Sequence, residues 1–323
     1  MPYAPAPPAL SAIPGLTLRE NIPLRGLTRF AIGGPARWLV DVSTPAALAA
    51  ALEAIRASGW PYALIGGGTN LIAADSGFDG FVLQFSGRGV AFDGARVEAE
   101  AGVALQDLVD ALIARGLRGL ETMTGIPGWV GGAVYGNAGA YGHSIQERVE
   151  SVRYLDSQAG DGHAVREIGV TQCGFQYRES VFKQHKDWVV LAVRLHLEPA
   201  EASELRATAD GIMKIRNAKY PPEMRCAGSI FKNLLWSQIP EPLRAQIPAE
   251  VVREGKVPAA YFLEVAGAKG MKDGDIQVAD YHANLIYNGG NGSAQQVRRV
   301  IQTLKARVAE RFGLELEEEV QYL

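Results

Sequence analysis

A short run of glycines is the first place where this sequence could do chemistry. It follows a predicted strand at 62–65 and consists of Gly66, Gly67, Gly68, Thr69 and Asn70. Consecutive glycines leave their backbone N–H groups unobstructed and accept positive φ angles, so such a turn can wrap an anion. No Lys or Arg occurs within residues 59–85, so main-chain dipoles would have to hold a phosphate here. A plain loop is the alternative interpretation of this segment.

A second glycine segment spans residues 125–142 and carries no charged side chain. Its seven glycines and three alanines would let the backbone approach a flat ligand closely. Asn137 adds a side-chain amide for hydrogen bonding. A loop of this length without a ligand would expose apolar groups to water for no gain. We therefore interpret this segment as functional.

Neither segment contains a standard nucleotide-binding motif. The patterns GxGxxG, GxxxxGKS and GxxxxGKT are absent from the sequence. A dinucleotide, if bound, would therefore be held by another architecture. No serine lies in a GxSxG elbow, which weakens a hydrolase reading. The histidines show no HExxH spacing, so we expect no metal site and interpret them as structural or surface residues.

The elements that would position these segments follow from hydrophobic periodicity and from capping signals. Residues 44–58 predict a helix that Thr44 can cap and Gly59 can end, and strand-like runs on both sides give a β-α-β opening. Other helices are expected at 104–115, 203–217 and 293–312, and strands at 38–42, 62–65, 81–85, 149–155, 188–197, 228–232, 283–287 and 314–323. The polar stretch 198–204 marks an expected domain boundary.

Bulk composition is typical of a globular protein. The 323 residues suffice for two or three domains, and 47% hydrophobic and 21% charged residues with a net charge of -3 leave no basic patch. No apolar run reaches about 18 residues, and the start lacks the charges of a signal peptide. We expect no nucleic-acid or membrane partner. Cys173 and Cys226 form no CxxC pair, which favours a reduced cytosol.

Seven stretches of this chain, taken together and in order, resemble the family of UDP-N-acetylenolpyruvoylglucosamine reductases. Any one of them alone would be weak evidence. They include both glycine segments and the sequence from Phe175 to Phe182. The full set is 27–36, 64–85, 125–142, 175–182, 227–233, 282–288 and 316–320. The FAD-binding domain of this family belongs to the vanillyl-alcohol-oxidase/PCMH flavoprotein superfamily.

The resemblance implies an α+β fold. A PCMH-type FAD-binding domain of two α+β lobes would span 17–199, and a smaller α+β domain at 200–323 would close over a sugar nucleotide. Residues 1–16 would form a flexible tail. The cofactor would be non-covalent FAD, because residues 60–75 contain no histidine, and NADPH would be the hydride donor. The protein would be a monomer in the cytoplasm.

The resemblance also assigns the glycine segments. It places the pyrophosphate of FAD at 66–70 and the isoalloxazine ring along the second segment. The residues implied there are Gly125, Ile126, Pro127, Gly128, Gly131, Gly132, Ala133, Asn137 and Gly139.

The implied reaction is the reduction of an enol ether in UDP-N-acetylglucosamine enolpyruvate to UDP-N-acetylmuramate, a step of peptidoglycan precursor synthesis. Such a reduction needs a hydride, a positioned acid and groups that stabilise negative charge. Ser229 matches the family's proton donor, and Arg178 and Glu319 match the pair that polarises the substrate. The alternatives are a small residue at a strand start for Ser229, a surface ion pair for Arg178 and an exposed acid for Glu319.

Four further residues are candidates for the uridine diphosphate: Tyr177, Lys219, Lys232 and Asn233. Basic residues outnumber acidic ones across 216–233, which suits a diphosphate, although a solvated basic face has the same charge pattern. Two features depart from the family: Leu234 stands where proline is usual, and about 20 residues at 235–258 look inserted. A flavin oxidase of the same superfamily and a non-catalytic nucleotide-sugar-binding protein are the other readings.

Overall fold

The computed structural model describes residues 6–159 and 162–323, which cluster into two compact units. Unit 1 comprises residues up to Ile22, Ala36–Gly67 and Phe78–Ala218, and unit 2 comprises Pro23–Pro35, Gly68–Gly77 and Lys219–Leu323. This division differs from the boundary expected at 199/200. The reason is helix α6 (Ala202–Lys219), whose Leu205 and Ala209 are buried in the core of unit 1.

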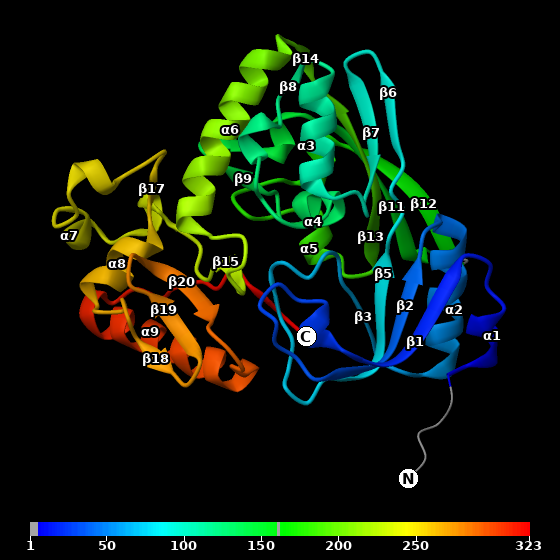
Figure 1. The fold of residues 1–323 in the computed structure, drawn as a ribbon, viewed down its shortest axis with the longest axis horizontal. Helices are drawn as coiled ribbons and strands as arrows, with labels where there is room; N and C mark the ends of the chain where they lie inside the picture. The colour runs from blue at the N-terminus through cyan, green and yellow to red at the C-terminus, as the bar shows by residue number, and fades with distance from the viewer. Residues whose placement is uncertain (1–5, 160–161) are drawn as a thin grey trace. The chain divides into compact units, whose positions relative to one another are not determined.

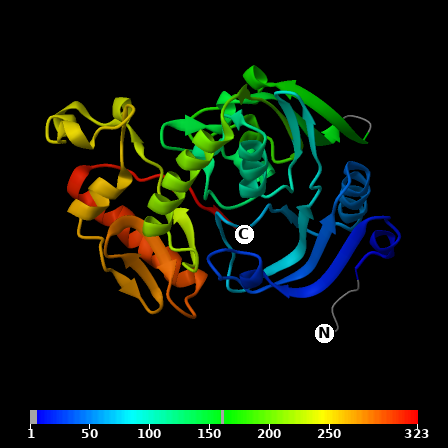
Figure 2. The same cartoon turned by 45° about the horizontal axis from the view of Figure 1, so that its top comes forward.

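Unit 1 opens with the expected β-α-β arrangement. One sheet has the strand order β1 (Leu16–Pro23), β2 (Pro35–Val42), β5 (Phe78–Phe85) and β3 (Tyr62–Leu64), with β2 and β3 parallel to β5. Helix α2 (Pro45–Ser58) lies beside this sheet (Figures 1 and 2). Its ends confirm the capping prediction, because the Thr44 hydroxyl accepts a hydrogen bond from the Ala47 N–H and Gly59 takes φ 72°.

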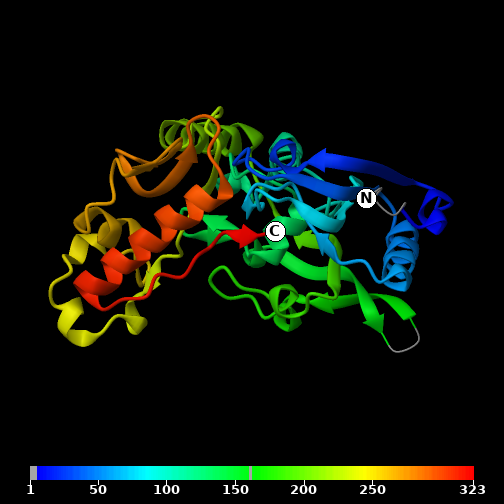
Figure 3. The same ribbon diagram turned by 90° about the horizontal axis from the view of Figure 1, so that it is seen from below.

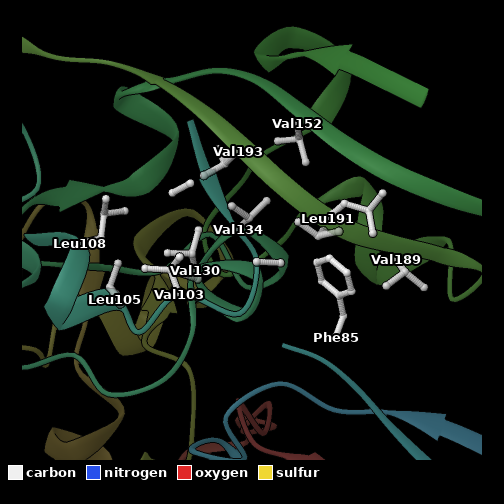
Figure 4. Close-up of a cluster of buried hydrophobic side chains, with 14 of the residues drawn as sticks. Phe85, Val103, Leu105, Leu108, Val130, Val134, Val152, Val189, Leu191 and Val193 are labelled. Carbon is white, nitrogen blue, oxygen red and sulfur yellow. The ribbon is translucent and has the colours of Figure 1, made fainter. Parts of the chain in front are cut away.

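The rest of unit 1 is built on an antiparallel sheet. Its strand order is β12 (Gly162–Gly169), β11 (Val149–Ala159), β13 (Trp188–His196), β7 (Arg96–Glu100) and β6 (Val90–Asp93). Helices α3 (Leu105–Ala114) and α4 (Val130–Tyr135) contribute to the same core. Figure 4 shows Val130 and Val134 of α4 close to Leu191 and Val193 of β13. The second glycine segment is therefore anchored in the hydrophobic core.

Unit 2 has its own sheet and its own core. The antiparallel order is β15 (Cys226–Ser229), β20 (His282–Asn288), β19 (Ile276–Ala279) and β18 (Lys272–Asp273). Helix α9 (Ala294–Phe312) runs along this sheet, and the chain then continues as an extended segment to β21 (Gln321–Tyr322) (Figure 3). The Ser293 side chain caps α9 together with Gln296, as a helix starting near 293 requires.

The remaining elements are short. The helices are α1 (Pro8–Ser11), α5 (Val181–Gln184), α7 (Glu241–Arg244) and α8 (Ala259–Val265). The strands are β4 (Leu71–Ile72), β8 (Leu117–Arg118), β9 (Gly139–Ala140), β10 (His143–Ser144), β14 (Glu198–Pro199), β16 (Leu234–Leu235) and β17 (Lys256–Val257). Within the described part of the chain, no helix is long and apolar enough to cross a membrane.

Three local expectations differ from the structure. The strand expected at 228–232 lies earlier, at Cys226–Ser229. The closing strand expected at 314–323 is reduced to Gln321–Tyr322, although Leu314 and Leu316 are buried as alternation requires. In the tail expected to be flexible, α1 forms and Leu10 is fully buried in the core of unit 1, whereas residues 1–5 lie outside the described residues.

Gly68 gives a test of the local packing in unit 2. Its φ is +64°, and a Cβ atom there would lie 1.8 Å from the Leu27 carbonyl oxygen. We expect Gly68→Ala to lower the free energy of unfolding by about 3 kcal/mol or more, because both the clash and the backbone strain oppose the methyl group. Urea unfolding of the apoprotein measures this loss. Gly26→Ala is the matched control, since its Cβ would meet nothing within 4 Å. Equal stabilities of the two variants would contradict the close approach of Gly68 to the Leu27 carbonyl.

Candidate functional site

Ser229 is positioned by a bulge at the end of β15. Cys226 pairs with Tyr287 and Ser229 pairs with Leu285, so the register shifts by one residue between them. Gly228 takes φ 75° inside this bulge, a conformation that glycine accepts without strain. Ser229 is half-buried, and its Oγ lies 3.2 Å from the hydroxyl oxygen of Tyr220. The bulge therefore turns the serine toward a tyrosine that the sequence did not single out.

Glu319 lies beside the same segment of unit 2. The Glu319 N–H donates to the Ile230 carbonyl at 2.7 Å, and the Lys232 N–H donates to the Glu317 carbonyl at 2.9 Å. These bonds place Glu319 next to Ile230, one residue from Ser229. Glu317 is exposed, whereas Glu318 and Glu319 are both half-buried, so exposed and buried residues stop alternating after Glu317. The structure thus brings two of the three predicted catalytic residues together.

Asn70 ties the first glycine segment to this pair. Its side-chain amide donates to the Glu319 carbonyl at 2.9 Å, and its own carbonyl accepts from the Gln321 N–H at 2.9 Å. The following residues continue the contact, because β4 pairs in parallel with β21. The contact of Asn70 with the cofactor stays a prediction, whereas the bond of its side chain to the backbone at Glu319 is observed.

Asn284 is a positioning residue that the sequence analysis treated only as part of a motif. Its side chain is buried, accepts a hydrogen bond from the Phe231 N–H at 2.9 Å and donates to the Phe231 carbonyl at 2.8 Å. Both bonds hold the backbone just after Ser229. A polar residue inside the apolar run of a predicted strand is the signal that could have identified it.

Arg178 belongs to unit 1, where it sits in a strained turn. Gln176 and Glu179 exchange backbone hydrogen bonds at 3.1 Å, and Arg178 between them has φ 59°. A positive φ at this place in a turn usually requires glycine or asparagine. Strain of this kind persists where surrounding contacts enforce it, and it clusters at functional sites.

Asn137 supplies one of the contacts that enforce the turn. It is buried, and its amide donates to the Gln176 carbonyl at 2.8 Å and to the Gln146 side chain at 3.2 Å. The Arg178 guanidinium donates to the Gly139 carbonyl at 2.9 Å. The turn that carries Arg178 is therefore attached at two points to the segment predicted to line the flavin ring.

Unit 1 has features that fit a flat cofactor against the glycine segments. A Cβ atom added at Gly66 or at Gly132 would meet nothing within 4 Å, so the backbone faces open space at both positions. Thr124, directly before the second glycine segment, is 2% exposed, and its hydroxyl has no hydrogen-bond partner among the described residues. Glycine backbone lets a planar group approach closely, and the Thr124 hydroxyl can hydrogen-bond a polar atom at the edge of such a group.

Two neighbouring glycines instead allow close packing of the chain on itself. A Cβ at Gly131 would lie 2.8 Å from the Cβ of Ala101, and one at Gly67 would lie 3.1 Å from the Trp129 ring. The predicted phosphate loop divides between the units, with Gly66 and Gly67 in unit 1 and Gly68 to Asn70 in unit 2.

The candidate diphosphate residues are found in several environments. Lys219 lies 5.1 Å from the centre of the Tyr220 ring, and its carbonyl accepts from the Tyr281 hydroxyl at 3.0 Å. Lys232 is 9% exposed and forms an ion pair with Glu317. The remaining two are Asn233, whose side-chain oxygen accepts from the Ala259 N–H, and Tyr177, whose ring lies 5.3 Å from the Arg178 guanidinium.

His282 and the two cysteines are perturbed by burial. Burial, with a smaller contribution from Lys219, lowers the pKa of His282 to about 4. The neutral ring accepts a hydrogen bond from the Asn284 N–H at its Nδ1.

Burial raises the pKa of the Cys173 thiol to about 11 and also raises the pKa of Cys226. Both cysteines are free, and among residues 6–159 and 162–323 no His, Cys, Asp and Glu side chains gather to hold a metal ion.

The strain at Arg178 can be measured with a pair of substitutions. Arg178→Gly and Arg178→Ala both remove the guanidinium, but only alanine keeps a Cβ at φ 59°. We expect the glycine variant to be the more stable of the two by on the order of 1 kcal/mol. Thermal unfolding of both variants gives the difference. An alanine variant as stable as the glycine variant would show that the turn relaxes without cost.

His282 predicts a loss of stability in acid. The unfolded chain binds a proton at this histidine below about pH 6.5, whereas the folded chain keeps it neutral to about pH 4. The free energy of unfolding therefore falls as the pH drops from 6.5 toward 4. The loss is at most about 3 kcal/mol, and solvent around the partly exposed ring makes it smaller. His282→Asn keeps an acceptor and should flatten the dependence of the melting temperature on pH across this window.

The control for this measurement is His196→Asn, a substitution at an exposed histidine. This variant should retain the wild-type loss of stability in acid. If His282→Asn shows the same slope as the control, the buried neutral ring is not its source.

Comparison with known proteins agrees with this architecture. A family model described as UDP-N-acetylenolpyruvoylglucosamine reductase, C-terminal domain, matches residues 220–323, and one described as FAD binding domain matches residues 36–166. The chain is similar to a solved structure of UDP-N-acetylenolpyruvylglucosamine reductase from Thermus caldophilus, with a TM-score of 0.71, 29% identity, and 95% and 98% of the two chains covered. The expected α+β fold, a PCMH-type FAD-binding domain followed by a smaller domain, is confirmed.

Two curated relatives extend over nearly the whole chain. The UDP-N-acetylenolpyruvoylglucosamine reductase of Solibacter usitatus is 55% identical, with 97% of this chain and 99% of that protein covered. The enzyme of the same name from Rubrobacter xylanophilus is 37% identical, with 93% of each covered. With this identity over this length, the chain belongs to the family of UDP-N-acetylenolpyruvoylglucosamine reductases and is a flavin-dependent oxidoreductase.

Proposed function

We propose that this chain reduces UDP-N-acetylglucosamine enolpyruvate to UDP-N-acetylmuramate with Ser229 as proton donor and with Arg178 and Glu319 as the polarising pair. The reaction consumes NADPH and contributes to peptidoglycan synthesis. When bound, FAD supplies the hydride chemistry. The observation that carries the proposal is the backbone pairing that sets Glu319 beside Ile230, next to Ser229.

Ser229 suits a proton transfer to carbon. A serine hydroxyl is a weak acid in water, so it donates only where a strongly basic centre forms directly against it. The bulge at Gly228 and the two Asn284 bonds to Phe231 hold the backbone on both sides of Ser229. Such a rigid support keeps the hydroxyl in place while the neighbouring carbon becomes basic.

Arg178 suits the substrate carboxylate. A guanidinium offers a planar fork of donors that matches a carboxylate and that lysine would not reproduce. The turn at 176–179 holds this side chain in a strained conformation, which is expected where the position of a charge must be set before the reaction. Its bond to Gly139 keeps it beside the segment proposed to line the flavin ring.

The cofactor and the sugar nucleotide are assigned to different residue types. Backbone at 66–70 and 125–139 would hold FAD without help from charged side chains, in agreement with the open space at Gly66 and Gly132. Lys219, Lys232, Asn233 and Tyr177 would hold the uridine diphosphate. Lys219 and Lys232 carry the positive charge that two phosphates require. We infer that the protein acts in the cytoplasm as a monomer.

Separate measurement of the two half-reactions tests the assignment of Ser229. The purified protein should show flavin absorbance, NADPH should bleach it, and anaerobic addition of the enolpyruvyl sugar nucleotide should restore it. We expect Ser229→Ala to bleach at a near-normal rate and to recover about 10²- to 10⁴-fold more slowly, the usual contribution of a general acid.

Ser237→Ala, a change at an exposed serine of unit 2, is the control and should follow the wild type. An equal slowing of both half-reactions in Ser229→Ala would refute its role as proton donor. Recovery of the absorbance with O₂ but not with the sugar nucleotide would instead support a flavin oxidase.

A further inference from the structure

We propose that Tyr220 is a positioning residue for the proton donor: its hydroxyl donates a hydrogen bond to Ser229 Oγ and resupplies the proton that Ser229 gives up. This inference rests on the proposed function, because it assumes that Ser229 protonates the substrate. The observation behind it is the distance of 3.2 Å between the two hydroxyl oxygens.

The Tyr220 ring is held in place by apolar contacts. It follows the end of α6 at Lys219 and precedes Pro221. The ring packs against a small core of Cys226, Ala279 and Leu285. The tyrosine is half-buried, and its hydroxyl reaches from this core to Ser229 at the end of β15. A hydroxyl carried on a packed ring has little freedom to leave its partner.

Proton counting decides which oxygen donates. Each of the two hydroxyls has a single hydrogen. If Ser229 directs its hydrogen at the substrate carbon, its Oγ can only accept within the pair, and the Tyr220 O–H must be the donor. Both O–H groups then point the same way: the Tyr220 O–H points to Ser229 Oγ, and the Ser229 O–H points to the substrate.

The transfer is balanced in atoms and charge. The electron pair of the substrate's carbanion-like carbon forms a C–H bond with the Ser229 hydrogen, and the electrons of the broken O–H bond stay on Oγ. In the same step the Tyr220 proton moves to Oγ, which restores the serine and leaves a phenolate. Water then returns a proton to the phenolate. A phenolate is far less basic than a serine alkoxide, so Tyr220 lowers the cost of protonating the carbon.

Lys219 lies where it can stabilise the charge that develops on Tyr220. Its Nζ is 5.1 Å from the centre of the Tyr220 ring. A cation at that distance in a half-buried setting interacts favourably with a phenolate and with the ring face. Lys219 is also proposed to hold the diphosphate, so it is left unchanged in the test.

Tyr220→Phe tests the relay because it keeps the ring and removes only the hydroxyl. We expect bleaching by NADPH at the wild-type rate and recovery with the enolpyruvyl sugar nucleotide about 10- to 100-fold slower, the range for one hydrogen bond to a developing charge. Tyr287→Phe is the matched control. Tyr287 packs on the same small core, and its hydroxyl bonds Gln277 instead of Ser229, so it should recover within about twofold of the wild type.

Two further readouts separate a relay from a packing effect. In mixtures of H₂O and D₂O the recovery rate of the wild type should curve with deuterium content, because two protons move, and that of Tyr220→Phe should be linear. In the Ser229→Ala background, Tyr220→Phe should cause no further loss, because the pair acts as one unit. A linear wild-type dependence, or an additive loss in the double variant, would overturn the relay.

The outcomes also distinguish this inference from the proposed function. If Ser229→Ala recovers at the wild-type rate, the assignment of Ser229 fails and the relay fails with it. If Ser229→Ala is slow while Tyr220→Phe recovers like Tyr287→Phe, the proton donor stands and the relay alone is wrong. Melting temperatures and flavin absorbance of both tyrosine variants verify that each is folded and loaded.

Discussion

The candidate site depends on one set of backbone hydrogen bonds, those that join residues 230–232 to residues 317–319. A peptide group in this ladder cannot shift without leaving a buried donor or acceptor unpaired. The ladder therefore sets how Glu319 lies relative to Ser229 more tightly than any side-chain contact could. Asn70 holds the main chain at Glu319 and Asn284 holds it at Phe231, each through hydrogen bonds of its side-chain amide.

Further backbone bonds of the C-terminal segment explain why residues 68–77 belong to unit 2. β4 pairs with β21, and the Ala74 N–H donates to the carbonyl of Leu323. Asn70, at the end of the first glycine segment, is thus bonded to the C-terminal segment that carries Glu319. A backbone predicted to bind phosphate and a carboxylate predicted to polarise the substrate share one support.

Unit 1 positions its part of the chemistry differently, through strain and through small residues. Arg178 and Asn137 both have positive φ angles, and Asn137 uses its buried amide to hold the turn of Arg178. Glycines in the neighbouring helix α4 either let the chain pack on itself, as at Gly131, or leave the backbone open, as at Gly132. The buried Val130 and Val134 anchor α4, and with it these glycines, in the core of unit 1 (Figure 4).

The sequence by itself determined the elements whose signals are local. Thr44, Gly59 and Ser293 mark helix ends correctly because a cap involves only residues within one turn. It did not reveal helix α4, since glycines disfavour a helix and burial of Val130 and Val134 stabilises it instead. The bulge before Ser229, the contact of Tyr220 and the pairing of Glu319 with Ile230 were decided by the tertiary structure. Each of these depends on which distant strand lies alongside, and periodicity within a single segment carries no information about its partner.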